Sequence, residues 1–440
     1  MRITVVGAGY VGLTTAVCFA HLGHEVLLVE KIPLKVDMLR RGEVPIYEPG
    51  MEEMLRENLK AGRLGVTSSL EEGIQFSDVI FICVGTPQSE DGSADLSQVE
   101  EVARETAKLM TSYKLLVEKS TVPVNTHKLI KRTVERYLKK KDVPYDVASN
   151  PEFLREGSAI RDFLYPDRIV IGVESERARK IFEELYAGFN CPIIYTDPAT
   201  AELIKHASNS FLAMKISYIN MVADLCEKVG ADIKLVADGM GFDKRIGREF
   251  LNAGLGWGGS CFPKDVRAFI KMAEDNGVDF GLLREVEKIN RRRIERFMEK
   301  VRSSLWSLKG KKLAVWGLSF KPNTDDIREA VSTKLVPLLL KEGARLVLYD
   351  PKAMENFRRV FPEGDDLKYA PDPYTAVEGA SALLILTEWE EFQHVDLLRV
   401  KELMELPIVV DGRNIYEPSV MKQLGFEYHC MGRGVKEPPA

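Results

Sequence analysis

The stretch of sequence that decides the fold is RITVVGAGYVG, residues 2–12. Its aliphatic and β-branched residues predict a buried strand, and the glycines that follow are spaced so that a tight turn leads into a helix. The first glycine permits the turn, the second lets a pyrophosphate approach the backbone, and the third lets the helix pack closely on the strand. The N-terminus of that helix offers N–H groups to phosphates. We therefore expect a dinucleotide to be held at Gly7, Gly9, Tyr10, Val11 and Gly12.

An acidic residue ends the next predicted strand, HEVLLVE, about 20 residues beyond the glycine motif. A carboxylate at this place binds the ribose 2′-hydroxyl of NAD and repels the 2′-phosphate of NADP. Lys31 and Lys35 weaken this preference because a lysine could receive that phosphate. The sequence therefore favours NAD, with Glu30 and Lys35 near its ribose, and a glycine turn without a ligand is the alternative.

Two threonines follow other predicted strands, in CVGTP (83–87) and EKSTVP (118–123). Ligands of an open parallel sheet bind beyond the carboxyl ends of its strands. We therefore expect Thr86 and Thr121 to contact the cofactor, although ordinary turn chemistry before proline explains each threonine equally well.

Strand-like and helix-like segments alternate over residues 1–196 and again over 306–440, which indicates parallel sheets covered by helices. Between them, apolar residues recur at helical spacing from Pro198 to Gly230 and predict one helix of about 30 residues. The sequence thus predicts an α/β protein with two doubly wound, Rossmann-like domains. A long central helix, within an all-helical domain at 197–305, joins them, and its apolar residues on more than one side indicate packing against another subunit. We expect residues 434–440 to form a disordered tail.

The composition excludes several classes of protein. The 440 residues carry 61 basic and 66 acidic side chains, a net charge of −5, which argues against a broad nucleic-acid-binding surface. No apolar run approaches the roughly 18 residues that cross a membrane. The six cysteines form no CxxC pair, which favours a reducing cytoplasm and neither a disulfide framework nor a zinc site. We expect a cytoplasmic protein without a metal, nucleic-acid or membrane partner.

Glycines crowd the N-terminal side of Cys261 in the segment GWGGSCFPKD, residues 256–265. Pro263 is typical of the first turn of a helix, so Cys261 is expected near a helix N-terminus, where the dipole stabilises a thiolate. The glycines leave room for a substrate against the sulfur. Lys264 would favour the thiolate and Asp265 would oppose it. Cys261 is the candidate nucleophile, and buried structural roles are expected for Cys18, Cys83 and Cys226.

Three further side chains could take part in chemistry. On the predicted long helix, Lys205 and Asn209 share one face with Glu202, and the apolar neighbours of Lys205 could make it an active amine or an oxyanion partner. A solvated lysine is the usual alternative. The segment NPEFLREG places Glu152 and Glu156 four residues apart, so both would point the same way if it is helical, and one could activate water. Two surface glutamates are otherwise the simpler interpretation.

Together these segments resemble the UDP-glucose/GDP-mannose dehydrogenase family over essentially the whole chain. GGSCFPKD is the most specific marker. The markers occur in family order: GAGYVG (7–12), VGTP (84–87), EKSTVP (118–123), NPEFLREG (150–157), ELIKHASNSFLAMKI (202–216), GWGGSCFPKD (256–265) and FKPNTDDIRE (320–329). The resemblance implies a homodimer that oxidises the C6 alcohol of UDP-glucose to the carboxylate of UDP-glucuronate with two NAD⁺.

The resemblance also implies a covalent intermediate. The thiolate of Cys261 would attack the C6 aldehyde, a second hydride transfer would turn the thiohemiacetal into a thioester, and water would hydrolyse it. Lys205 and Asn209 would stabilise the oxyanion. Asp265, with water and Thr121, would help to remove the alcohol proton.

The remaining expected contacts follow from the same resemblance. Glu152 would position or activate the hydrolytic water, and Glu156 would line both the substrate and the cofactor site. Lys264 and Arg328 would contact NAD, and Arg245 would reach the substrate of the partner subunit. The expected substrate contacts are Glu152, Phe153, Leu154, Arg155, Glu156, Lys205, Asn209, Arg245, Phe250, Leu251, Asn252, Ala253, Gly254, Gly258, Lys321 and Arg413.

Two departures from the family pattern bear on the substrate. Glu30 stands where many members have aspartate, and its longer arm should keep the preference for NAD. Trp257 stands where UDP-glucose enzymes often have phenylalanine, and tryptophan also occurs in the GDP-mannose branch. Lys264, within SCFPKD, favours UDP-glucose over a UDP-N-acetylhexosamine.

Three alternatives therefore stay open: the same chemistry on GDP-mannose or another UDP-hexose, a non-catalytic nucleotide-sugar-binding protein, and a one-step dehydrogenase of the β-hydroxyacid type. The catalytic residues together argue against the second. Cys261 and the second β/α domain argue against the third.

Overall fold

The structure is a computed structural model that describes residues 1–89 and 92–433 of the chain. The predicted disordered tail, 434–440, lies outside the described residues. The chain forms two compact units: the first comprises residues 1–208 and 267–278, and the second comprises 209–266 and 279–440. In the described part of the chain, no helix is both long and apolar enough to cross a membrane.

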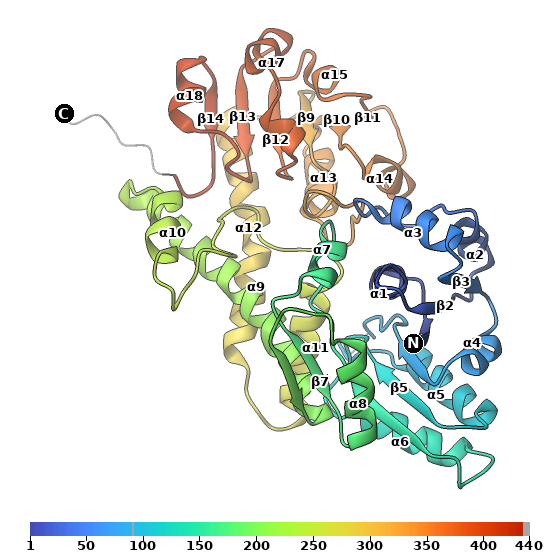
Figure 1. The fold of residues 1–440 in the computed structure, drawn as a ribbon. Helices are drawn as coiled ribbons and strands as arrows, with labels where there is room; N and C mark the ends of the chain where they lie inside the picture. Colours follow the sequence, from blue (N-terminus) through green and yellow to red (C-terminus); the bar gives the residue numbers. More distant parts are fainter. Residues whose placement is uncertain (90–91, 434–440) are drawn as a thin grey trace. The chain divides into compact units, whose positions relative to one another are not determined.

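The first unit is built on an eight-stranded sheet in the order β3-β2-β1-β4-β5-β6-β7-β8 (Figure 1). Its strands are β1 (Arg2–Val6), β2 (Glu25–Val29), β3 (Leu64–Thr67), β4 (Val79–Ile82), β5 (Lys114–Glu118), β6 (Tyr145–Ser149), β7 (Ile169–Gly172) and β8 (Ile193–Thr196). The six strands from β3 to β6 are parallel, in the order 3-2-1-4-5-6 that is usual for dinucleotide-binding sheets.

The wholly parallel sheet expected from the sequence is wrong at its far edge. β7 is antiparallel to β6 and contacts it through the single pair Ser149–Gly172, and β8 then runs parallel to β7. A parallel crossover usually needs a helix laid along the sheet. Between β6 and β7 the chain has only the six-residue α7 (Ala159–Leu164), so the strand direction reverses there.

Helices cover both faces of this sheet because successive strand residues point to opposite sides. One core contains Ile3, Val5 and the buried face of α1; the other contains Val6, Ile80 and residues of α5. The helices that precede the long helix are α1 (Tyr10–His21), α2 (Pro33–Arg40), α3 (Met51–Lys60), α4 (Leu70–Phe76), α5 (Ser97–Leu109), α6 (Thr126–Tyr137), α7 and α8 (Glu176–Leu185).

The predicted long helix is confirmed as α9 (Pro198–Val229), which is unbroken over 32 residues and contributes to both units. Three more helices follow: α10 (Ile233–Gly241), α11 (Phe262–Asp275) and α12 (Gly281–Leu305).

The second unit repeats the architecture of the first. Its sheet is wholly parallel in the order β11-β10-β9-β12-β13-β14, which is again 3-2-1-4-5-6 (orange to red in Figure 1). The strands are β9 (Lys312–Trp316), β10 (Arg345–Tyr349), β11 (Leu367–Tyr369), β12 (Ala382–Ile385), β13 (Ile408–Asp411) and β14 (Glu427–His429). The helices are α13 (Val331–Lys341), α14 (Met354–Val360), α15 (Pro373–Val377), α16 (Glu390–Gln393), α17 (Leu397–Leu403) and α18 (Pro418–Gln423). The second Rossmann-like sheet expected from the sequence is therefore confirmed.

Candidate active site

The glycine motif forms the turn between β1 and α1, at the carboxyl end of the central strand. A Cβ on Gly12 would lie 1.8 Å from the carbonyl oxygen of Gly7, so the helix packs directly onto the turn. A Cβ on Gly9 would meet no atom within 4 Å, which leaves open space above the turn. No side chain caps the N-terminus of α1 at Gly9. The first N–H groups of α1 are therefore suited to bind a pyrophosphate. The residues of this turn thus suit the binding of a dinucleotide.

Glu30 follows β2 and folds back onto this turn. Its two carboxylate oxygens accept the N–H groups of Ala8 (3.0 Å) and Ile32 (2.9 Å). Each carboxylate oxygen has a second lone pair, so the group can still accept hydrogen bonds from a ribose. Lys35, half-buried, lies on α2 shortly after Glu30.

The second sheet has an acid at the corresponding place, but the carboxylate of that acid is already occupied by hydrogen bonds within the fold. Asp350 follows β10, is fully buried, and its Oδ2 accepts hydrogen bonds from the N–H groups of Leu318 (2.7 Å) and Ser319 (3.1 Å). The same oxygen accepts the indole N–H of Trp389 (3.1 Å), and Oδ1 accepts the N–H of Ala353 (2.7 Å). These hydrogen bonds use the acceptor capacity of the Asp350 carboxylate, so it cannot accept a hydrogen bond from a ribose hydroxyl.

The threonine loops meet at the edge that bears the glycine turn. Thr86 follows β4 and Thr121 follows β5, and the hydroxyl of Thr86 donates to the carbonyl of Thr121 at 2.9 Å. Ser120 makes a second link between the loops by donating to the carbonyl of Val84 at 2.8 Å. The structure thus brings both threonines to the predicted edge.

Glu152 and Lys205 form a buried ion pair in the first unit. The Nζ of Lys205 lies 2.9 Å from Oε1 of Glu152, and their side chains are only 5% and 6% exposed. The ring of Phe153 lies 5.5 Å from the same ammonium group. Burying a charge pair is costly, so such a pair marks a candidate functional site. The solvated-lysine interpretation of Lys205 is wrong.

The helix that would align Glu152 with Glu156 does not form, because residues 150–156 have no regular structure. The chain instead turns at Glu152, whose Oε2 accepts the N–H of Leu154 at 2.6 Å. Arg155 pairs with Asp162 at 2.6 Å. The N–H of Gly157 donates to the hydroxyl of Tyr10 at 2.7 Å, which brings the half-buried Glu156 near the start of α1.

Three residues to which the sequence analysis assigned no part in the chemistry hold these loops in place. Glu202, on α9, accepts the backbone N–H groups of Asn125 (2.6 Å) and His127 (3.0 Å), and burial raises the pKa of its carboxyl. His206 lies 2.7 Å from the carbonyl of Val122. Helical spacing was the only signal for both, since they share the buried face of Lys205.

Lys119 is the third of the residues that hold these loops in place. It is buried, lies 3.2 Å from Oδ1 of Asn150, and has a pKa lowered by burial. Its contact joins the end of β5 to the segment that carries Glu152. A lysine beside a strand end carries no local signal that distinguishes it from a surface charge.

In the second unit, Cys261 lies directly before α11, as predicted. Its carbonyl accepts the N–H of Asp265 at 2.8 Å, as a helix N-cap does, and the residue is exposed. Gly258, three residues before Cys261, has a packing role that the sequence did not reveal. A Cβ on Gly258 would lie 2.3 Å from the carbonyl of Glu329, so that space is filled by the 320–329 segment rather than left for a substrate.

Asn209 and Asp265 form a buried hydrogen bond beside the cysteine. The amide of Asn209 donates to Oδ2 of Asp265 at 2.6 Å, and Asp265 is only 1% exposed. Lys264 lies 3.0 Å from Oδ1 of the same carboxylate. Lys264 was expected to favour the Cys261 thiolate and Asp265 to oppose it. Because the two side chains form one ion pair, these two effects partly cancel.

The predicted substrate loop, 250–254, lies against the end of β13. The guanidinium of Arg413 donates to the carbonyls of Leu386 (2.9 Å) and Gly256 (3.0 Å). The amide of Asn414 donates to the carbonyl of Ala253 at 3.4 Å. The structure therefore joins Arg413 to the segment between the substrate loop and Cys261. Within that loop Leu251, Ala253 and Gly254 are buried and Asn252 is exposed.

The other predicted cations are engaged locally. Arg245 is 88% exposed and pairs with Asp243 at 2.6 Å, and Arg328 pairs with Asp326 at 2.6 Å. The ammonium group of Lys321 lies 5.5 Å from the ring of Phe320. Their predicted contacts with substrate or cofactor stay predictions.

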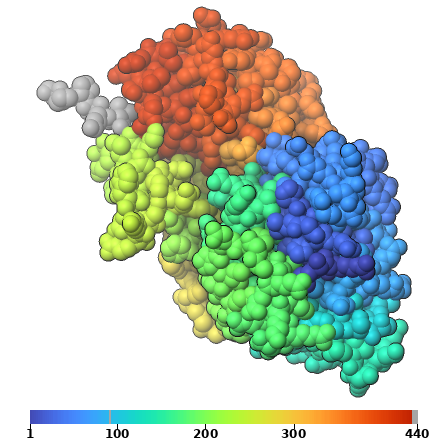
Figure 2. Space-filling view, viewed as in Figure 1, coloured from blue at the N-terminus to red at the C-terminus, as the bar shows by residue number. Residues whose placement is uncertain are grey.

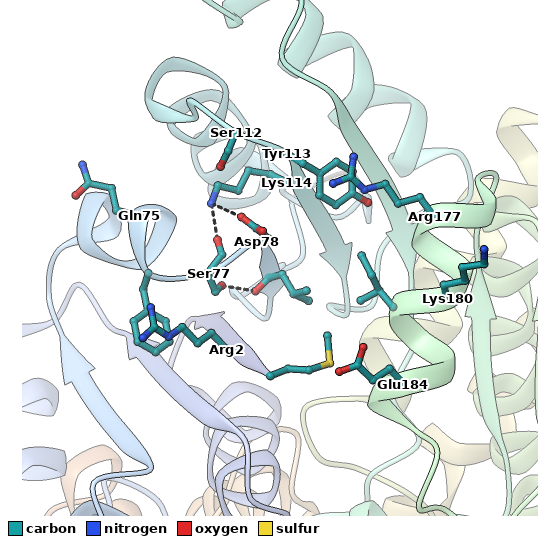
Figure 3. Close-up of a pocket in the computed structure, with 14 residues that line it drawn as sticks. Arg2, Gln75, Ser77, Asp78, Ser112, Tyr113, Lys114, Arg177, Lys180 and Glu184 are labelled. Atoms are coloured by element: carbon teal, nitrogen blue, oxygen red, sulfur yellow. Dashed lines mark hydrogen bonds and ion pairs between the residues drawn. The ribbon is translucent and has the colours of Figure 1, made fainter.

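A hollow of about 690 Å³ lies at the opposite edge of the first sheet, at the amino ends of β1, β4 and β5 (Figure 3). Its lysine, Lys114, is held by the carbonyl of Ser77 (2.5 Å) and by Asp78 (3.2 Å). Arg2 pairs with Glu25 at 3.2 Å. Ligands of such sheets bind at the carboxyl ends of the strands, so this hollow is not the site. Among the described residues, no three His, Cys, Asp or Glu side chains gather as metal ligands.

Three family models match the chain in order. They describe the NAD binding domain (residues 1–190), the central domain (199–292) and the UDP binding domain (314–418) of the UDP-glucose/GDP-mannose dehydrogenase family. The UDP-glucose 6-dehydrogenase of Pseudomonas aeruginosa is 47% identical, over 98% of each chain.

Solved structures agree with these matches. A UDP-glucose dehydrogenase from Pyrobaculum islandicum superposes with a TM-score of 0.90 and 41% identity, over 99% of this chain and 98% of the other. A UDP-D-ManNAc dehydrogenase from Pyrococcus horikoshii gives 0.87 and 30% identity, over 99% of this chain and 100% of the other.

Replacing the third glycine of the motif should disrupt the first unit. In Gly12→Ala the new methyl would overlap the Gly7 carbonyl, so we expect a loss of at least about 2 kcal/mol in the free energy of unfolding. Gly9→Ala is the matched control: its backbone is ordinary (φ −75°) and its Cβ meets nothing, so stability should persist while NAD⁺ binding weakens. Urea unfolding and calorimetric titration measure the two effects, and equal stability of the two variants would contradict this packing.

One thiol should react far faster than the others. Only thiolates are alkylated, and burial raises the pKa of Cys18, Cys83 and Cys430 to about 12. Those thiols stay protonated between pH 7 and pH 9, because deprotonation begins only as the pH approaches their pKa. Mass spectrometry after brief iodoacetamide treatment at pH 8 should find Cys261 modified, while Cys18, Cys83 and Cys430 stay unmodified both in the wild type and in Cys261→Ser. Rapid labelling of a buried cysteine would contradict the structure.

Proposed function

Because the chain belongs to the UDP-glucose/GDP-mannose dehydrogenase family, we propose that it oxidises UDP-glucose to UDP-glucuronate, reducing two NAD⁺. The observation that carries this proposal is the placement of Cys261: an exposed thiol at the N-terminus of α11, beside the buried Asn209–Asp265 pair. A one-step dehydrogenase has no use for a nucleophile there. The high identity to UDP-glucose 6-dehydrogenases favours glucose as the sugar.

The first oxidation needs a group that removes the proton of the C6 hydroxyl. We assign this role to Asp265, acting through a water molecule and with the hydroxyl of Thr121. Its carboxylate already accepts a hydrogen bond from Asn209 and forms an ion pair with Lys264, and both contacts fix its position. Bound NAD⁺ accepts the hydride in each of the two oxidations.

Cys261 then retains the aldehyde. Its thiolate forms a bond to C6, and the carbonyl electron pair becomes an oxyanion that Lys205 and Asn209 stabilise. When this oxyanion returns its pair to carbon, a second hydride leaves and a thioester remains. Water activated by Glu152 adds to the thioester, and the thiolate leaves as the carboxylate forms. Lys205 and Glu152 form one buried ion pair, so both side chains can act on the same intermediate.

The nucleotide sugar is assigned to the second unit, with contacts from residues 250–254, Gly258, Lys321 and Arg413. Glu156, Lys264 and Arg328 are assigned to the cofactor. Arg328 is two-thirds exposed, so its guanidinium is accessible to a ligand. We also propose the division into domains at 1–196, 197–305 and 306–440, and a cytoplasmic location, which suits six free cysteines.

A homodimer would cover the exposed apolar side chains of α9 and α10. Leu225, Val229 and Leu235 are exposed on these helices, and Phe242, directly after α10, is 87% exposed. This region of the second unit lies at its surface (yellow-green in Figure 2). Exposed apolar patches of this kind mark interaction sites. Arg245 lies on the same segment, from which it would reach the partner's substrate.

The four-electron mechanism fixes the product ratio. With excess NAD⁺ and limiting UDP-glucose, we expect about two NADH per sugar at completion, because the intermediate stays on Cys261. Cys261→Ser should stop before the acid, with turnover reduced about 10³-fold or more. Absorbance at 340 nm and chromatography of the product measure both. One NADH per sugar in the wild type would refute the thioester, and faster oxidation of GDP-mannose would move the substrate.

The dimer is tested by charging its apolar surface. Phe242→Asp should convert the wild-type dimer to a monomer in light scattering and should reduce turnover, because Arg245 would lose its partner. Trp306→Asp is the matched control, since this aromatic residue is 97% exposed and lies outside α9 and α10. A monomeric wild type, or a Phe242→Asp dimer with full activity, would refute the interface.

A further inference from the structure

The segment from Gly254 to Trp257 has no regular secondary structure, yet side chains hold the backbone of its first and last residues. The N–H of Gly254 donates to Oδ1 of Asn220 at 2.8 Å, and its carbonyl accepts from Nε of Arg293 at 3.0 Å. The N–H of Trp257 donates to Oδ1 of Asn290 at 2.8 Å, and its carbonyl accepts from Nδ2 of the same side chain at 2.8 Å. The first and last residues of the segment thus have all four backbone polar groups bound.

The groups that hold the two ends of this segment come from two helices of the second unit, and Arg413, after β13, holds the carbonyl of Gly256 between them. Asn290 and Arg293 lie one turn apart on α12, so they face the segment side by side. Arg293 is 1% exposed and is itself fixed by Oδ1 of Asp224 at 2.6 Å. The indole N–H of Trp257 donates to the hydroxyl of Ser217 on α9 at 3.1 Å.

This segment lies between the two parts of the proposed site. The predicted substrate loop ends at Gly254, and Cys261 follows Trp257 by four residues. Four of the six residues in the stretch GLGWGG are glycine, which gives the unfolded chain unusual freedom and leaves few side chains to fix the loop. Side chains from outside must therefore set where the thiol lies relative to the sugar.

We infer that Asn290 and Arg293 are positioning residues, which fix the distance between the sugar-binding loop and the Cys261 thiol. This inference rests on the proposed function. A displacement of about 1 Å between reacting groups lowers rates about 100-fold, although binding itself persists. Loosening the segment should therefore slow capture of the aldehyde by Cys261 while the NAD site of the first unit is unaffected.

Two substitutions loosen the segment with little change in size. Asn290→Asp keeps an acceptor for the N–H of Trp257 but places a carboxylate oxygen against its carbonyl. Arg293→Lys keeps the charge but loses the planar fork that reaches Gly254 and Asp224 together. Arg292→Lys is the matched control, since the neighbouring Arg292 is 62% exposed and lies 3.9 Å from Glu285. Asn290 is only half-buried, so its variant tests the inference even where Arg293→Lys does not fold.

The measurement compares kcat, the KM for NAD⁺, and free aldehyde trapped by a hydroxylamine reagent. In Asn290→Asp and Arg293→Lys we expect kcat to fall 10- to 100-fold, the KM for NAD⁺ to stay within twofold, and trapped aldehyde to rise above the wild-type amount. Arg292→Lys should match the wild type. Wild-type kcat and no trapped aldehyde in a folded Asn290→Asp protein would overturn the inference. So would a parallel loss of kcat and NAD⁺ binding, which indicates general destabilisation.

A second readout does not depend on turnover. The rate of iodoacetamide reaction with Cys261, in the ligand-free protein at pH 8, should change at least threefold in Asn290→Asp and remain at the wild-type value in Arg292→Lys. If the wild type does not oxidise UDP-glucose, the proposed function fails, and these alkylation rates alone decide the positioning role. Equal rates in all three proteins would then refute it.

Discussion

The contacts between α9 and the irregular segments of each unit are the interactions on which the candidate site residues depend. A regular helix fixes the spacing of the side chains along it, at 1.5 Å per residue. Over its 32 residues α9 binds the loop of Thr121 through Glu202, the turn of Glu152 through Lys205, and Asp265 through Asn209. Further along, Asn220 binds the segment before the nucleophile.

That arrangement explains why buried polar groups are so frequent on this helix. A helix that only packed would present aliphatic side chains, since an unpaired buried charge is heavily penalised. Glu202, His206 and Asn220 instead meet backbone groups of irregular segments, which would otherwise lack these hydrogen bonds. The helix therefore supplies rigidity to segments that cannot make regular structure of their own.

The sequence predicts the centre of each sheet and misses its edges. The interior strands can be recognised in the sequence, because strands covered on both faces read as continuous apolar runs. The strands β3, β8, β11 and β14, at the ends of the two sheets, carry a weaker signal. An edge strand is short and partly exposed, as the pattern of β8 shows, so its sequence resembles a loop. The reversal at β7 was missed for a related reason, since periodicity carries no information on strand direction.

The candidate site also contains residues that the sequence predicts and residues that it does not. The glycine turn, Glu30 and Cys261 could be predicted because local chemistry marks them. Lys205 and Asn209 needed the helical face as well as the residue type. Arg293 could not be found, because an arginine in the run NRRR of an amphipathic helix looks like its solvated neighbours. Only the three-dimensional packing reveals that one of these arginines is buried.

The occupied carboxylate of Asp350 has a consequence for the timing of the reaction. Of the two acids that directly follow β2 and β10, only Glu30 remains open to a ribose, which indicates that the two proposed oxidations of one sugar share a single cofactor site. That site has to release its reduced cofactor and accept a fresh molecule halfway through the cycle. During this exchange the half-oxidised sugar is a reactive aldehyde, exposed to water and to loss by diffusion. The proposed bond to the sulfur of Cys261 would hold the half-oxidised sugar during this exchange, so the lifetime of the bound intermediate would set how long the exchange can take.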